Sequence, residues 1–130
     1  MAIIEMERPP VIGETFPMEV TCVRSDDEHS RLDLTGATIW MTLKTDPTTQ
    51  ADAAAALQID NGANPTQFEV NIPNTNGVFT ATFTATQTAT LTAGTVYYID
   101  VKVKTVEGYV YYPVPIQQII FDQWVTRSTS

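Results

Sequence analysis

The sequence predicts an all-β fold, an antiparallel β-sandwich of seven to eight short strands with one short helical turn. Three observations lead to this prediction. Residues 78–84 and 97–104 alternate apolar and polar side chains with period two, as strands with one buried face do. Threonine, which is β-branched and favours sheet over helix, supplies many of the polar positions. Turn-forming residues recur about every eight to twelve positions, a spacing typical of a sandwich.

The two alternating runs predict which way their side chains point. In the first run, Phe79, Ala81 and Phe83 fall on one face and threonines fall on the other. In the second run, one face is apolar and the other is mostly charged: Tyr97, Ile99, Val101 and Val103 against Tyr98, Asp100, Lys102 and Lys104. Strands with one dry face need a second layer to cover it, so two packed sheets are expected.

Length and composition indicate one globular domain. The chain has 130 residues, of which 43% are hydrophobic and 17% charged. We assign residues 1–14 to an N-terminal arm, 15–127 to the β-sandwich domain and 128–130 to a polar tail. The net charge of −8 argues against nucleic acid as a partner, because phosphate binding needs clustered Lys and Arg. No run of about eighteen apolar residues is present, so no membrane span is expected.

The N-terminal arm admits two interpretations. Pro9-Pro10 stiffens an extended backbone and should block sheet pairing. The residues before it are either a frayed terminus, or an arm whose Ile3, Ile4 and Met6 dock on a neighbouring subunit.

A first strand is expected over residues 16–22. Cys22 is the only cysteine, so no internal disulfide can form, and its apolar neighbours predict a buried thiol. Residues 25–30 read as a polar loop that holds His29 beside three carboxylates. Such a loop either binds a metal ion or faces water, and adjacent loop acids usually face water. Residues 32–36 are rich in turn formers and should form the corner before the next strand.

That next strand spans residues 37–44. Its inward side chains are expected to be Ile39, Met41 and Leu43, and its outward ones Thr38, Trp40, Thr42 and Lys44. A large aromatic such as Trp40 on a polar face is either packed beneath a loop or part of an interface.

The rest of the chain reads as short strands separated by turns. A helical turn near residue 51 should lead into a strand at 57–59, and a turn at 60–62 should follow. Between the two long strands, residues 86–93 are expected to form the helical turn that crosses from sheet to sheet and places Leu91 in the core. The other expected elements are a strand at 67–72, a hairpin connection at 73–77, a tight turn at 107–108, a strand at 109–112 and a closing strand at 116–121 with Ile119 and Phe121 on one face.

No arrangement of residues in the sequence predicts catalysis. Nucleophilic catalysis by Cys or Ser needs a histidine held by a third group, and nothing links His29 to Cys22. Asp26 and Asp27 are adjacent in a loop, whereas a glycosidase needs two carboxyls that face each other across a sugar. Phosphate-loop, dinucleotide and zinc motifs are absent from the sequence. We therefore expect no enzyme activity, cofactor or metal.

Binding of carbohydrate is an alternative, because β-sandwiches often present aromatic side chains to sugars. The strands supply several candidates: Trp40, Tyr98, Tyr109, Tyr111, Tyr112 and Trp124. The competing interpretation is that strand aromatics pack in the core or against cross-strand neighbours.

The sequence also resembles a family of phage proteins. The stretch from Leu32 to Lys44 is similar to a phage-encoded immunoglobulin-like domain, like the N-terminal domain of baseplate upper proteins of tailed phages. Later stretches fit the same pattern: Gly77-Val78-Phe79, Thr88-Ala89-Thr90-Leu91, the run from Gly94 to Val101, Glu107-Gly108 and Val125-Thr126-Arg127. The chain has no long C-terminal extension of the kind that baseplate upper proteins carry, so a receptor-binding adaptor role is not expected.

The resemblance implies an immunoglobulin-like sandwich that is a structural component of a tailed-phage virion, made in the host cytoplasm. It would act in the tail, baseplate or neck as one of many symmetric copies contacting other virion proteins. A capsid decoration protein on the phage head and a carbohydrate-binding module that contacts host glycans are the alternatives. The candidate interface residues are Ile3, Ile4, Met6, Trp40, Tyr112 and Trp124.

Overall fold

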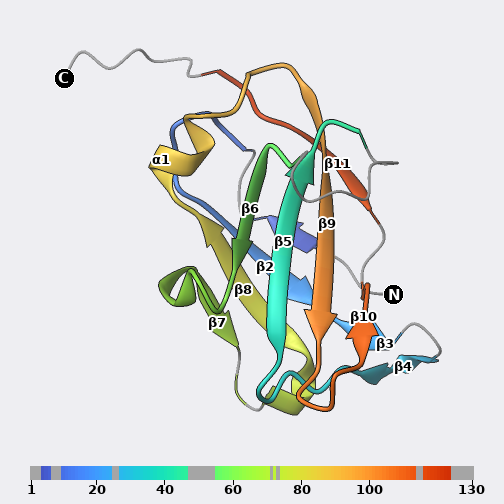
Figure 1. Cartoon of the computed structure of the whole chain (residues 1–130). Coiled ribbons are helices and arrows are strands. Elements are labelled where there is room, and N and C mark those ends of the chain that lie inside the picture. The colour runs from blue at the N-terminus through green and yellow to red at the C-terminus, as the bar shows by residue number, and fades with distance from the viewer. Residues whose placement is uncertain are drawn as a thin grey trace.

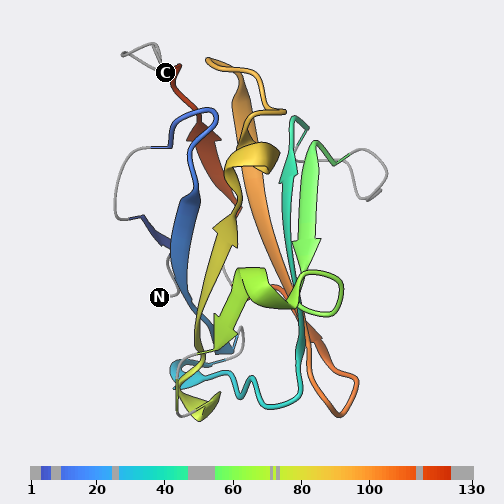
Figure 2. The same ribbon diagram turned by 90° about the vertical axis from the view of Figure 1, so that its left-hand side faces the viewer.

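A computed structural model of the chain describes residues 4–6, 10–24, 27–46, 55–70, 72, 74–113 and 116–123. The described residues form two antiparallel sheets packed face to face (Figure 1), and Figure 2 shows the sheets as two separate layers. The four-stranded sheet has the order β1-β2-β8-β7, made of β1 (Ile4–Met6), β2 (Phe16–Thr21), β8 (Val78–Phe83) and β7 (Phe68–Val70). The five-stranded sheet contains β10 (Val110–Tyr111), β9 (Val96–Lys104), β5 (Thr38–Lys44) and β6 (Leu57–Asp60) in that order, with β11 (Gln117–Ile120) also paired to β9.

This strand order confirms the predicted fold class and its immunoglobulin-like character. An immunoglobulin-like sandwich has one sheet in the order A-B-E-D and a second sheet that contains C, F and G. Here β1-β2-β8-β7 corresponds to the first sheet, and β5, β9 and the β10–β11 edge correspond to C, F and G. All eight strands expected from the sequence are present. Three further strands occur in the described residues: β1, β3 (Val23–Arg24) and β4 (Asp27–Arg31).

The core lies between the inner faces of the two sheets, as the period-two pattern predicts. Every predicted inward side chain of β5, β8 and β9 is at most 4% exposed. The residues concerned are Ile39, Met41, Leu43, Phe79, Ala81, Phe83, Tyr97, Ile99, Val101 and Val103. Burial of this apolar surface is the main favourable term for joining the two layers.

The crossover between the sheets is the short helix α1 (Ala85–Thr88), which Figure 2 shows at the upper end of the two layers. It begins with a capping box, in which the Thr84 hydroxyl accepts from the Gln87 N–H and the Gln87 side chain accepts from the Thr84 N–H. Leu91 follows it and is 7% exposed, so the predicted helical turn and its buried leucine are confirmed.

The described part of residues 1–14 is hydrogen-bonded into the sandwich, which differs from the arm expected from the sequence. β1 pairs antiparallel with β2, and Ile4 lies in the core of its own chain. The chain then crosses to the other sheet, where the Asp122 N–H donates to the Pro10 carbonyl at 3.0 Å and the Ile12 N–H donates to the Asp122 carbonyl at 2.9 Å. Pro10 therefore does not block pairing, because a proline lacks an N–H but keeps its carbonyl as an acceptor.

Two other local predictions need correction. Residues 27–30, expected in a polar loop, belong to β4, which pairs with β3 as a separate two-stranded hairpin. Its sequence has no apolar alternation, so periodicity gave no signal for a strand. The strand expected to reach Ile72 stops at Val70, and Ile72 is 91% exposed. The helical turn expected near residue 51 lies outside the described residues, as do residues 128–130.

The corner at residues 32–36 is confirmed and has a clear physical basis. The Asp33 carboxylate accepts from the Thr35 N–H at 2.9 Å, and this bond lowers the pKa of Asp33. Gly36 has a positive φ of +67°, which favours glycine. Leu32 and Leu34 are buried on either side of Asp33, so the corner is fixed to the core. None of the helices that the structure describes is long and apolar enough to cross a membrane.

Candidate interaction surface

The outer face of the five-stranded sheet carries the most distinctive surface chemistry of the described residues. We call it the front face. Strand register sets its layout: Lys102 lies beside Trp40 and Trp40 beside Asp60, while Asp100 lies beside Thr42 and Thr42 beside Gln58. These rows come from β9, β5 and β6, three strands far apart in sequence.

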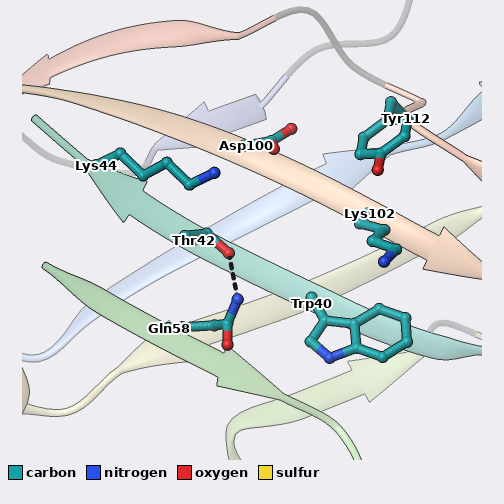
Figure 3. A pocket seen from close by; sticks show the side chains of 7 residues that line it. All are labelled: Trp40, Thr42, Lys44, Gln58, Asp100, Lys102 and Tyr112. Carbon is teal, nitrogen blue, oxygen red and sulfur yellow. Dashed lines mark hydrogen bonds between the residues drawn. The ribbon is translucent and has the colours of Figure 1, made fainter. Parts of the chain in front are cut away.

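A cleft of about 210 Å³ lies on the front face. Its lining is mixed in character, with two aromatic, two cationic, one acidic and two neutral polar side chains, which Figure 3 labels. They are Trp40, Thr42, Lys44, Gln58, Asp100, Lys102 and Tyr112.

Contacts inside the cleft hold several of these side chains in place. The Lys102 amine lies 5.0 Å from the centroid of the Trp40 ring, a cation–π contact. The Gln58 amide donates to the Thr42 hydroxyl at 2.9 Å. In Figure 3 the Lys44 side chain extends toward Asp100, and the Tyr112 hydroxyl is directed toward Lys102.

Burial in the cleft corrects one feature of the predicted outer face. Thr42 and Lys44 do lie on that face, as expected, but they are only 5% and 8% exposed. A lysine is seldom so little exposed unless its charge is paired.

An apolar row borders the cleft along the β10–β11 edge of the same sheet. Four large hydrophobic side chains there are about half exposed: Val110 at 47%, Tyr112 at 55%, Ile116 at 49% and Ile120 at 46%. Val110 pairs with Lys104 and Ile120 with Val96, so the row lies along the side of β9 opposite β5. Exposed apolar side chains with polar neighbours, here including Gln118 between Ile116 and Ile120, are typical of protein contact sites.

The structure brings together only part of the predicted interface set. Trp40 and Tyr112 meet in the cleft, although 71 residues separate them in the chain. Ile4 is instead buried in the core, while Met6 lies in β1 and its side chain is outside the described part. Ile3 and Trp124 also lie outside the described residues. Periodicity placed Trp40 on the outer face, but no sequence signal paired it with Tyr112, Lys102 or Gln58.

Two other tyrosines lie away from the cleft. Tyr111 packs against the core, whereas Tyr112, the residue after β10, lines the cleft. Tyr109 is 64% exposed and lines a separate hollow at one end of the sandwich. Tyr98 pairs with Lys44 but does not line the cleft, so Trp40 and Tyr112 are the two aromatic side chains in its lining.

Among the described residues, no three His, Cys, Asp or Glu side chains are arranged to hold a metal ion. His29 lies in β4, and its side chain is outside the described part. Cys22 is fully buried, and this burial raises the pKa of its thiol to about 12, so the thiolate nucleophile is absent at neutral pH.

Cys22 gives a testable dependence of stability on pH. The pKa of the Cys22 thiol is 9.0 when the group is solvent-exposed, as in the unfolded chain, and about 12 in the folded protein. Between these two pH values the unfolded chain loses a proton that the folded chain keeps. The free energy of unfolding should therefore fall by about 1.4 kcal/mol per pH unit from this group as pH rises above 9.0. Urea unfolding at pH 8 and pH 10.5 measures the loss, and Cys22→Ala should show a shallower loss. Equal losses in both proteins would contradict the assignment.

The fold defines the class: an immunoglobulin-like β-sandwich, here with a row of half-exposed apolar side chains on the outer face of its five-stranded sheet. No family model matches the chain, and no curated protein matches it either. Among solved structures, it is similar to AggA, the major subunit of aggregative adherence fimbriae type I from Escherichia coli. That structure is 12% identical, with 95% of each chain covered and a TM-score of 0.31. A TM-score this low supports no inference about function.

Proposed function

We propose that this chain is a non-enzymatic structural subunit of a tailed-phage virion that acts through protein–protein contacts. The observation that carries the proposal is the row of half-exposed apolar side chains on the front face: Val110, Tyr112, Ile116 and Ile120. Leaving such a row exposed is unfavourable, and a partner surface that covers it recovers the free energy of apolar burial. The resemblance of residues 32–44 to phage immunoglobulin-like domains supports the virion as the setting, in the tail, baseplate or neck.

Substitution of the apolar row tests this proposal. Tyr112→Ser combined with Ile120→Ser should leave the fold intact, because both side chains are about half exposed. In a host that carries the encoding phage genome, the wild-type chain should sediment with purified particles. The amount of the double variant in purified particles should be lower by roughly tenfold or more, because truncating residues at the centre of an interface costs that much binding.

A matched control uses exposed apolar residues outside the front face. Val106→Ser combined with Ile72→Ser removes two side chains that are 69% and 91% exposed, without changing the row. This control should enter particles at the wild-type level. Wild-type chain that never sediments with particles would refute the proposal, and immunogold labelling of particles would distinguish a tail or neck position from decoration of the head.

Binding of carbohydrate is the second candidate, favoured by the meeting of Trp40 and Tyr112 in a polar cleft. Sugars stack on aromatic rings and bond to side chains such as Gln58 and Asp100. The cation–π contact with Lys102 occupies part of the Trp40 ring, which makes this candidate the weaker one. A glycan array without saturable binding would remove it.

A further inference from the structure

The two outer faces of the sandwich differ in charge. All three lysines of the chain, Lys44, Lys102 and Lys104, lie in the strands of the front face, where they exceed the two aspartates Asp60 and Asp100. This is the cationic side of a protein whose net charge is −8. The front face also carries the apolar row.

The outer face of the four-stranded sheet, which we call the back face, has the opposite character. Its four strands contain three glutamates and no lysine or arginine. Register aligns Glu19 and Glu69 in one line across the sheet, because both pair with Thr80, and both are exposed. The two carboxylates give this face an acidic strip that is complementary to a cationic surface.

We infer that the front face of one copy docks on the back face of a second copy of this chain. The lysines of β9 would then lie over the glutamate line, and the apolar row would cover the threonine methyl groups of β2 and β8. Charge complementarity selects this partner, because two front faces would oppose lysine to lysine and two back faces glutamate to glutamate. The inference rests on the proposed function, in which the chain acts by assembly.

This geometry makes the contact head-to-tail rather than two-fold symmetric. The two docking faces lie on opposite sides of the sandwich, as the edge-on view in Figure 2 shows for the two sheets. Each docked copy therefore leaves one front face and one back face free. Copies joined in this way form a closed ring when the rotation per copy closes, and an open stack when it does not.

Opposite charge reversals test the inference on the purified full chain. The front variant is Lys102→Glu with Lys104→Glu, and the back variant is Glu19→Lys with Glu69→Lys. Glu19 and Glu69 are exposed, and Lys102 and Lys104 point away from the core, so both variants should fold. Sedimentation velocity measures self-association over a concentration series at low and high salt. Glu107→Lys, at an exposed turn, is the control for a change of charge.

The expected result is that the wild-type chain and the control associate with rising concentration, and less so at high salt. Each reversed variant alone should associate at least roughly tenfold more weakly. An equimolar mixture of the two variants should recover association, because each contact then joins unlike charges. Both variants keep a negative net charge, so general attraction does not explain recovery.

Three results would overturn the inference: a wild-type chain that stays monomeric at all concentrations, a back variant that associates as well as wild type, or a mixture that fails to recover. The second result would indicate a two-fold contact between front faces. These outcomes are separate from the proposed function, because the chain can still enter particles through Tyr112 and Ile120 by contacting a different virion protein.

Discussion

Replacing Gly77 with alanine should destabilise the protein by about 3 kcal/mol or more. This is a large effect for a substitution that adds one methyl group and removes no side chain. Gly77 has a φ of +72°, a region that costs an L-residue roughly 1–2 kcal/mol. An added Cβ would also lie 2.6 Å from the Cys22 carbonyl oxygen and 2.9 Å from the Leu32 carbonyl oxygen. Both neighbours are backbone atoms, so the chain itself must move.

Such a movement would break contacts that join three segments. The Cys22 N–H donates to the Gly77 carbonyl at 2.7 Å, and the Leu32 N–H donates to the Cys22 carbonyl at 3.1 Å. The end of β2, the corner at residues 32–36 and the start of β8 therefore meet at this glycine. Thermal unfolding should show a fall in Tm of roughly 10 °C for Gly77→Ala.

Gly94→Ala is the matched control. Gly94 has a similar φ of +81°, but an added Cβ would meet no atom within 4 Å. It should therefore cost only the backbone strain, roughly 1–2 kcal/mol. Equal losses for the two substitutions would show that the close approach at Gly77 contributes nothing.

Truncation of Phe121 should cost about 3–5 kcal/mol, which is a large part of the 5–15 kcal/mol that usually separates folded and unfolded states. Phe121 is fully buried although it lies beyond the end of β11. Its ring packs edge-on against Phe16 at 5.5 Å and Tyr97 at 6.3 Å between centroids. Phe16 belongs to one sheet and Tyr97 to the other, so Phe121→Ala leaves a cavity between the layers.

The neighbouring residue provides the control for this substitution. Ile120 is 46% exposed and points to the front face, so Ile120→Ala should cost less than about 1 kcal/mol. Urea unfolding of both variants gives the comparison. A loss at Phe121 no larger than that at Ile120 would contradict its assigned position in the core.

Local pattern predicted the fold well wherever one side of a strand is buried. Phe79 and Val101 could be assigned to the core because their neighbours alternate with them at period two. The same reasoning could not find β4, whose residues are all polar, or β1, which has only three residues. Such strands are held by backbone hydrogen bonds to a neighbouring strand. These bonds do not depend on alternating apolar side chains, so the strand's own sequence shows no periodic pattern.

The candidate site was predictable only in part, for a related reason. Alternation placed Trp40 and Lys102 on the outward faces of their strands, but it gave no information on which strands are adjacent. Tyr112 follows β10, and its place beside Trp40 depends on the pairing of β10 with β9 and of β9 with β5.

The amino-acid sequence by itself determined the class of fold, the inward and outward sides of each long strand, and the acidic balance of the whole chain. The fold class and the strand faces follow from alternation among a few neighbouring residues. The acidic balance follows from the composition of the whole chain. Only the tertiary structure decided that the lysines share one face with the apolar row while Glu19 of β2 and Glu69 of β7 align on the other. That separation is set by hydrogen-bond register between strands distant in the chain, and register is a property of the assembled sheets.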